Sequence, residues 1–210
     1  MIVHDDARLN MVEGQLRPNK VTDERVIDAF LRLGRELFVP AALGARAYID
    51  DDLPLGGGRY LMQPMVAARL LQAAVVQPND SALVVGAGVG YEAAVLALLG
   101  ARGVLALEPD AGLARLGRSA LVDHGIATVS YVEAPMTAAP PPPAQLGSGN
   151  RARSPYDVIL FAGAVTAVPS EISAQLAEGG RMVVVLRPQQ PVGRYPDHAH
   201  WRNVRAAHYI

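Results

Sequence analysis

The chain has 210 residues; 50% are hydrophobic, 19 are Lys or Arg, 20 are Asp or Glu, and none is Cys. This length suits one domain with a substantial core, and a formal net charge of −1 gives no general attraction to nucleic acid or anionic lipid. The lack of cysteine excludes disulfides, thiolate nucleophiles and Cys-ligated zinc.

The sequence predicts neither a targeting segment nor a membrane span. The N-terminus is acidic at Asp5 and Asp6, where a signal peptide would be basic and then apolar. The longest apolar stretch, 93–107, is interrupted by two glycines and Arg102, so it is too short to cross a bilayer. We expect a monomeric cytoplasmic protein that binds neither nucleic acid nor membrane.

The first 78 residues read as a helical region. Asp23 is a suitable N-cap for a helix over 24–33, and a second helix is predicted from Pro64 through Val75. Between them, the acidic and glycine-rich segment 50–58 predicts an irregular, solvated loop. A metal site there is disfavoured, because three adjacent acids point in different directions.

Residues 79–187 alternate short apolar runs with helical ones, which predicts a parallel sheet covered on both faces. The expected strands are Ala82–Val85, Val104–Leu107, Thr128–Val132, Val158–Phe161 and Met182–Leu186, and the expected helices are Tyr91–Leu99, Asp110–His124 and Ser170–Glu178. The fold class is therefore α/β, a Rossmann-like, doubly wound and mostly parallel sheet with strand order 3-2-1-4-5. A mobile low-complexity loop is expected over 138–154, and a tail or short hairpin over 188–210.

A glycine-rich turn follows the first strand: Val85-Gly86-Ala87-Gly88-Val89-Gly90-Tyr91. Glycines allow the backbone to turn sharply and to approach a ligand closely, and the following helix directs free N–H groups at it. Tyr91 occupies the position where a dinucleotide fingerprint has its third glycine. The spacing Gly-x-Gly-x-Gly is typical of the nucleoside-binding turns of S-adenosylmethionine methyltransferases.

Glu108 ends the second strand, 20 residues after Gly88, where a Rossmann-like fold places an acid on the ribose hydroxyls. The alternative is that Glu108 only favours the start of the next helix. A turn filled by side chains, or a Glu108 directed away from it, would contradict the nucleoside interpretation.

Motifs spread from Met11 to Leu186 resemble the protein-L-isoaspartate O-methyltransferase family. They are Met11–Leu16, Arg35–Pro40, Tyr48, Leu53–Gly56, Gln63–Met65, Val85–Tyr91, Pro155–Ile159 and Glu178–Arg181. The resemblance implies methyl transfer from S-adenosylmethionine to the free carboxylate of L-isoaspartyl or D-aspartyl residues in damaged proteins. It also implies a class I S-adenosylmethionine methyltransferase fold with a C-terminal hairpin, and a loop at 50–58 that covers the cofactor site.

Three positions depart from the pattern of that family. Met62 stands where the family has a reactive-centre serine, Val84 stands where an acid commonly precedes the glycine turn, and Glu133-Ala134-Pro135 replaces a Gly-Asp pair. No catalytic residue is therefore assigned. Two alternatives stay open: a methyltransferase with another acceptor, and an impaired nucleoside-binding relic that acts by protein interaction.

The resemblance implies that glycines of the turn hold the methionine part of the cofactor, Glu108 its ribose, and Glu133 with Ala134 the adenine edge. Gln63 and Pro64 would border the methyl group. The predicted cofactor-binding residues are Gln63, Pro64, Gly86, Ala87, Gly88, Gly90, Tyr91, Glu108, Pro109, Glu133, Ala134 and Ala162.

Two further segments invite a functional interpretation. Small residues at 162–164 leave room beside a cofactor or simply allow tight packing. His198, His200 and His208 near Trp201 suggest a metal site, but a solvated tail fits their terminal, proline-rich context better. We expect no metal.

Overall fold

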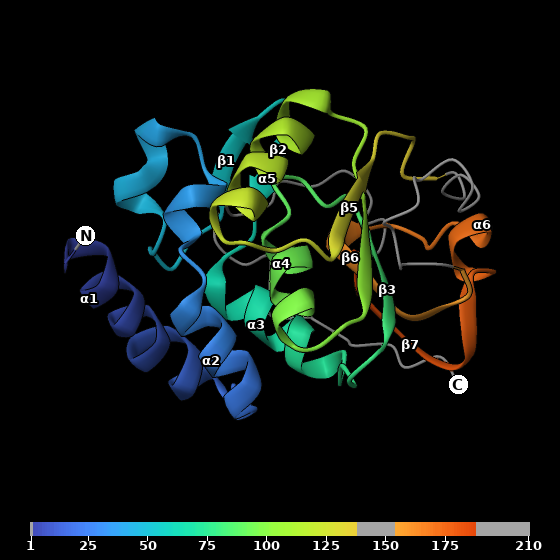
Figure 1. Ribbon diagram of the computed structural model, residues 1–210, viewed down its shortest axis with the longest axis horizontal. Helices are drawn as coiled ribbons and strands as arrows, with labels where there is room; N and C mark the ends of the chain where they lie inside the picture. Colours follow the sequence, from blue (N-terminus) through green and yellow to red (C-terminus); the bar gives the residue numbers. More distant parts are fainter. Residues whose placement is uncertain (1, 138–153, 188–210) are drawn as a thin grey trace.

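A five-stranded parallel sheet forms the centre of the computed structural model, which describes residues 2–137 and 154–187 (Figure 1). Its strands stand in the order β5-β4-β3-β6-β7. They are β3 (Ser81–Val85), β4 (Gly103–Leu107), β5 (Val129–Val132), β6 (Tyr156–Val165) and β7 (Leu176–Leu186). Numbered from the first strand of this sheet, the order is 3-2-1-4-5, so the predicted topology is confirmed.

Alternate residues of the strands enter two separate cores. Val84, Ala106 and Leu160 pack with the N-terminal helices, whereas Leu83 and Ile159 pack on the opposite face. Successive side chains of a strand point to opposite faces, so strands that are apolar throughout bury both faces of the sheet. This is why the strands read as continuous apolar runs rather than as alternating ones.

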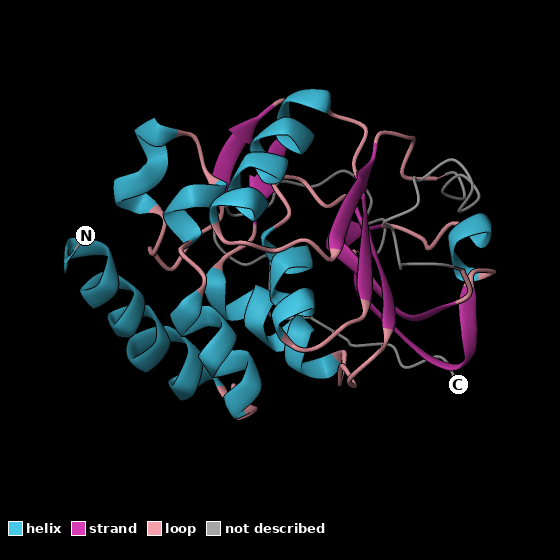
Figure 2. Cartoon of the chain, in the orientation of Figure 1, coloured by secondary structure: helices cyan, strands magenta, loops and turns pink. Residues whose placement is uncertain are grey.

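The longer helices lie together on one side of the sheet in Figure 2, and α6 (Ser170–Ser173) lies on the other. These helices are α1 (Ile2–Met11), α2 (Glu24–Arg32), α3 (Pro64–Ala73), α4 (Tyr91–Leu98) and α5 (Ala111–Asp123). The shorter turns are η1 (Val12–Leu16), η2 (Arg17–Asn19), η3 (Arg35–Phe38) and η4 (Ala41–Arg46).

Local capping sets where two of these helices begin. The Asp23 carboxylate accepts the N–H of Arg25, as predicted, and the Asp110 carboxylate accepts the N–H groups of Gly112 and Leu113. Each cap satisfies donors that have no partner inside the helix.

Two predicted segments differ in the structure. The segment expected to be an irregular loop forms an antiparallel hairpin of β1 (Leu53–Gly56) and β2 (Arg59–Leu61). Glycines 56, 57 and 58 adopt φ of 94°, 57° and 75°, which only glycine adopts without strain, so the run expected to prevent structure forms the turn instead. The helix expected over 170–178 ends at Ser173, and the chain from Leu176 joins β7.

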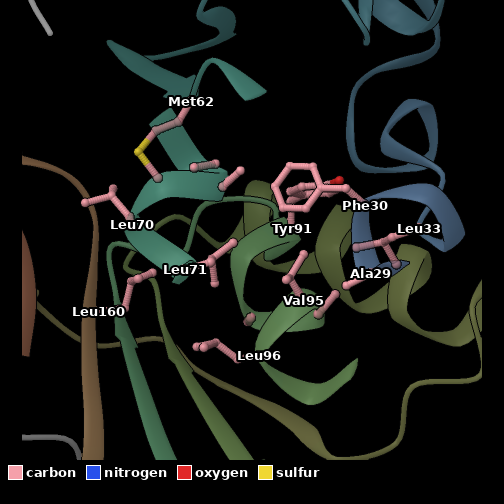
Figure 3. Close-up of a cluster of buried hydrophobic side chains, with 14 of the residues drawn as sticks. Ala29, Phe30, Leu33, Met62, Leu70, Leu71, Tyr91, Val95, Leu96 and Leu160 are labelled. Carbon is pink, nitrogen blue, oxygen red and sulfur yellow. The ribbon is translucent and has the colours of Figure 1, made fainter. Parts of the chain in front are cut away.

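The N-terminal helices and the sheet share one continuous core. Phe30 of α2, Leu70 of α3 and Val84 of β3 belong to the same buried cluster, and Figure 3 shows labelled side chains of α2, α3, α4 and β6 gathered in this cluster. A boundary at residue 78 therefore stays a prediction. The expected loop over 138–154 and the expected C-terminal hairpin lie essentially outside the described residues.

Candidate functional site

The glycine turn joins β3 to α4 at the carboxyl edge of the sheet. Gly86, Gly88 and Gly90 adopt φ of 69°, 54° and 80°, a region that residues with a side chain rarely adopt. The N–H groups of Gly86 and Ala87 donate to the carbonyl oxygen of Leu107, at 2.9 and 3.1 Å. The backbone itself therefore fixes the turn against the end of β4.

The side chain of Tyr131 in β5 lies between this turn and α5 and contacts both. Its hydroxyl donates to the carbonyl oxygen of Gly88 at 3.3 Å, and a Cβ atom on Gly90 or on Gly117 of α5 would collide with its ring or hydroxyl. Sequence reasoning missed Tyr131, because a tyrosine in a strand looks like any half-buried strand residue. The close approach to two glycines is visible only in three dimensions.

Glu108 is directed at the turn, as predicted. Its side chain is fully buried, and its carboxylate accepts the N–H of Gly88 at 2.6 Å and that of Asp110 at 3.0 Å. A buried carboxylate needs such donors to offset the loss of hydration. The geometry places an acid next to the middle glycine of the turn, where it could receive hydroxyl groups of a ligand.

Arg59, at the start of β2, also pairs with Glu108. Its Nη1 donates to Oε1 at 3.1 Å and its Nη2 to Oε2 at 2.6 Å, a bidentate arrangement of the strong kind. The same Nη2 donates to the carbonyl oxygen of Gly86 at 3.0 Å. Sequence reasoning missed Arg59, whose position in a glycine-rich segment gave no signal of a partner 49 residues away.

Side chains therefore cover the turn, which is one of the two observations named above as contradicting a nucleoside site. The other observation is not met, because Glu108 faces the turn. A Cβ placed on Gly86 would lie 2.9 Å from the sulfur of Met136, and one on Gly88 would lie 4.0 Å from Arg59 and from Leu55. A ligand at the turn must displace at least the Arg59 guanidinium, since that group holds both oxygens of Glu108.

The acidic segment before the hairpin is bound to Gln63, the residue that precedes α3. The N–H of Gln63 donates to Asp52 at 2.7 Å, and its side-chain amide donates to the Asp50 carboxylate at 2.6 Å. No group of His, Asp and Glu residues able to hold a metal is found within 2–137 and 154–187. Asp50 and Asp52 thus hold Gln63 in place at the start of α3.

Met62, which stands at the reactive-centre position, has a buried side chain that belongs to the main core (Figure 3). Its carbonyl oxygen accepts Nη2 of Arg35, while Nε of Arg35 donates to the carbonyl oxygen of Ala47 at 2.8 Å. Arg35 is fully buried, and its guanidinium lies 4.9 Å from the ring centre of Tyr91. The Arg35 guanidinium thus anchors the segment that leads to Gln63.

The side chain of Tyr91, a predicted cofactor-binding residue, lies in this core. Its ring packs edge-on against Phe30 and Phe38, with centroids 5.5 and 5.3 Å apart (Figure 3), and burial raises the pKa of its hydroxyl. A ligand at the turn would meet Tyr91 through its backbone, since the phenol is inside the protein.

The remaining predicted residues lie around the edge of the site. Glu133 is exposed and pairs with Arg118 of α5 at 2.8 Å, and Pro109 is exposed. Ala134 and Ala162 are half-buried on opposite faces of the sheet, while Pro64 and Ala87 are buried. Their roles stay predictions, and the histidines at 198, 200 and 208 lie outside the described residues.

A parallel sheet in this order, with a glycine turn after its first strand and a buried acid after its second, defines a Rossmann-like nucleoside-binding domain. The family model for protein-L-isoaspartate(D-aspartate) O-methyltransferase matches residues 7–202. The chain belongs to this family, and the resemblance found in the sequence is confirmed.

Curated relatives agree with this assignment. The chain is 39% identical over 187 residues to the protein-L-isoaspartate O-methyltransferase of Methylorubrum populi, covering 88% of this chain and 81% of the relative. It is 40% identical over 180 residues to that of Koribacter versatilis, covering 84% and 75%. These relatives favour the isoaspartyl function over the two alternatives left open by the sequence.

Solved structures share the fold. A protein-L-isoaspartate O-methyltransferase superposes with a TM-score of 0.69 at 26% identity, over 85% of this chain and 55% of that one. A putative protein-L-isoaspartate O-methyltransferase from Plasmodium falciparum, solved with S-adenosyl-L-homocysteine, superposes with a TM-score of 0.67 at 17% identity, over 88% and 84%. No helix in the described part of the chain is long and apolar enough to cross a membrane.

Proposed function

We propose that this chain transfers the methyl group of S-adenosylmethionine to the free carboxylate of L-isoaspartyl or D-aspartyl residues in damaged proteins. The observation that carries the proposal is the buried Glu108 carboxylate against the N–H of Gly88, in a chain matched by the family model over residues 7–202. We further propose a monomeric cytoplasmic enzyme, which light scattering and cell fractionation would test.

The residues at the turn fit the cofactor of this family. S-adenosylmethionine supplies a methyl group on a sulfonium, which a carboxylate displaces directly. Glu108 would accept the ribose hydroxyls once the Arg59 guanidinium is displaced, since the N–H groups of Gly88 and Asp110 hold its carboxylate at the turn. Gly86, Gly88 and Gly90 would hold the methionine part, with no Cβ atoms of Gly86 and Gly88 in its path, and Glu133 with Ala134 would border the adenine.

The acceptor needs little chemical activation. A carboxylate with a pKa of about 3.9 is ionised at neutral pH, so no strong general base is required. The protein therefore acts by orienting the acceptor and by excluding water. Gln63 and Pro64 would border the methyl group, and the Asp50 contact to the Gln63 amide keeps that side chain in place.

The replacement of the family serine by Met62 lowers the expected rate. A thioether cannot donate a hydrogen bond, and one lost polar contact of this kind costs on the order of a hundredfold to a thousandfold in rate. Met62→Ser should raise isoaspartyl turnover if that contact is the missing one. An unchanged rate would place the acceptor contacts elsewhere.

A radiolabelled methyl-transfer assay tests the proposal directly. The substrate is a short peptide that contains isoaspartate, and the control is the same peptide with ordinary aspartate. We expect label on the isoaspartyl peptide alone, and none with Gly88→Arg, whose side chain would fill the turn. Binding of S-adenosylhomocysteine without any methyl transfer would overturn the proposed activity.

A further inference from the structure

The guanidinium of Arg59 occupies the place where the cofactor's ribose is expected. It holds both carboxylate oxygens of Glu108 and the carbonyl oxygen of Gly86. Glu108 also accepts two backbone N–H groups, so its four acceptor positions are in use. Ribose hydroxyls and Arg59 cannot hold these oxygens together, and binding of one requires release of the other.

Release of Arg59 leaves a cation that needs a new partner. Its side chain is only 23% exposed, and a charged group removed from water is costly unless it is paired. The reaction itself brings an anion to this edge of the sheet, namely the acceptor carboxylate. Arg59 lies four residues before Gln63, which with Pro64 is proposed above to border the reacting methyl group.

We propose that Arg59 binds two partners in turn: Glu108 in the conformation described above, and the acceptor's carboxylate once ribose has displaced it. Arg59 is then an acceptor-binding residue that becomes available only after the cofactor has entered. This inference rests on the proposed function for the nature of the acceptor, but the competition at Glu108 does not depend on it.

The hairpin that carries Arg59 is built to allow this exchange. β1 and β2 pair with each other and form a two-stranded sheet separate from the central one. Leu53 and Leu61 hold the base of this hairpin in the main core, so any movement of Arg59 involves the glycine end and not the base. Its turn consists of three glycines, all with positive φ and with open space around their Cβ positions. The adjacent Tyr60 is 57% exposed.

The competition is measured by calorimetry with S-adenosylhomocysteine. We expect Arg59→Gln to bind this nucleoside at least threefold more tightly than the unmodified protein, because no guanidinium has to be displaced. Arg59→Lys keeps the charge but loses the bidentate contact, so its affinity for S-adenosylhomocysteine should lie between those of Arg59→Gln and the unmodified protein. Equal or weaker binding by Arg59→Gln would overturn the competition.

A matched control comes from a second arginine–carboxylate pair. Arg32 contacts Asp28 on the exposed face of α2 at 3.2 Å, so Arg32→Gln removes the same kind of contact far from the turn. Its affinity for S-adenosylhomocysteine should equal that of the unmodified protein. A gain as large as that of Arg59→Gln would mean a general effect of net charge and would also overturn the competition.

Binding of Arg59 to the acceptor carboxylate is tested by measuring the affinities of two peptides for two proteins, the unmodified protein and Arg59→Gln. The proteins, saturated with S-adenosylhomocysteine, are titrated with an isoaspartyl peptide and with its isoasparagine analogue, which has a neutral amide in place of the carboxylate. The unmodified protein should prefer the carboxylate peptide at least tenfold, and Arg59→Gln should retain less than a threefold preference. Equal preferences, or no peptide binding by the unmodified protein, would overturn this half of the proposal.

The outcomes separate this inference from the proposed function. Methyl transfer to the isoaspartyl peptide with no effect of Arg59→Gln on either binding measurement would leave the function standing and remove the inference. Tighter nucleoside binding by Arg59→Gln in a protein without methyl transfer would keep the competition and remove the function.

Discussion

The turn Gly86–Gly90 and the segment Arg59–Gln63 meet at one edge of the sheet, but they are held in place differently. The turn is fixed by backbone hydrogen bonds to Leu107 and by the glycines' own φ angles. The segment depends on side chains from distant parts of the chain: Arg35 holds the carbonyl oxygen of Met62, and Glu108 holds Arg59.

This difference explains which part of the site can change. The backbone contacts of the turn to Leu107 persist when other side chains change, although the turn still needs its glycines and the contacts of Glu108 and Tyr131 to Gly88. The other segment rests on two guanidinium groups, so a single substitution there would alter the side of the site where we propose that the acceptor binds, the acceptor side. The departure from the family pattern at Met62 lies on this side, although Val84 and Glu133 show that the cofactor side also varies.

The largest expected effect is on stability and concerns Arg35, the buried side chain that holds the carbonyl oxygen of Met62. Arg35→Ala leaves the carbonyl oxygens of Ala47 and Met62 without their donor and opens a cavity beside Tyr91. We expect the free energy of unfolding in urea to fall by about 3–5 kcal/mol. Arg69→Ala, on the exposed face of α3, should change it by less than about 0.5 kcal/mol, and equal losses would mean that burial of Arg35 is unimportant.

The next effect concerns the support beneath the turn. A Cβ atom on Gly117 would lie 2.6 Å from the carbonyl oxygen of Val89 and would collide with Tyr131. Gly117→Ala should therefore lower the free energy of unfolding by about 1–3 kcal/mol. Gly14→Ala has open space around the new methyl group and serves as the control. A neutral Gly117→Ala would show that α5 can shift without disturbing the turn.

Glu108→Ala probes the cofactor side by ligand binding. Loss of the carboxylate removes the expected acceptor of the ribose hydroxyls, so affinity for S-adenosylhomocysteine should fall at least tenfold, or about 1.4 kcal/mol. Calorimetry measures this, with exposed Glu178→Ala as the control. An unchanged dissociation constant would remove Glu108 from the ribose site.

The smallest expected effect concerns Glu92 of α4, whose carboxyl group is buried near Arg35. Burial raises the pKa of the Glu92 carboxyl, and Arg35 opposes this only in part. As the pH rises above about 4.3, the unfolded chain loses the Glu92 proton while the folded protein retains it. The free energy of unfolding therefore falls as the pH rises through this range. Glu92→Gln should remove that loss and melt about 2–4 °C higher than the unmodified protein at neutral pH.

Thermal melting at several pH values checks this sign. The difference between Glu92→Gln and the unmodified protein should vanish near pH 4, where both forms are neutral at this position. A glutamine variant that is less stable at neutral pH would show instead that Glu92 is charged and stabilised by Arg35.

Local patterns in the sequence determined the sheet, its strand order and the turn that carries Glu108. Continuous apolar runs bury both faces of a strand, and glycine accepts the positive φ values of Gly86, Gly88 and Gly90 more readily than residues with a side chain, so these features follow from neighbouring residues. The same local reasoning failed at 53–61, because the glycines that interrupt a helix or strand also form the turn of a hairpin.

Tertiary structure alone decided what covers the turn and what holds the acceptor side. Arg59 and Glu108 are 49 residues apart, and Arg35 and Met62 are 27 apart. No periodicity or spacing connects such pairs, because they meet only when helices and strands pack into one core. Tyr91 illustrates the same limit: its place after the turn was clear from the sequence, but only packing against Phe30 and Phe38 turned its ring away from the ligand side.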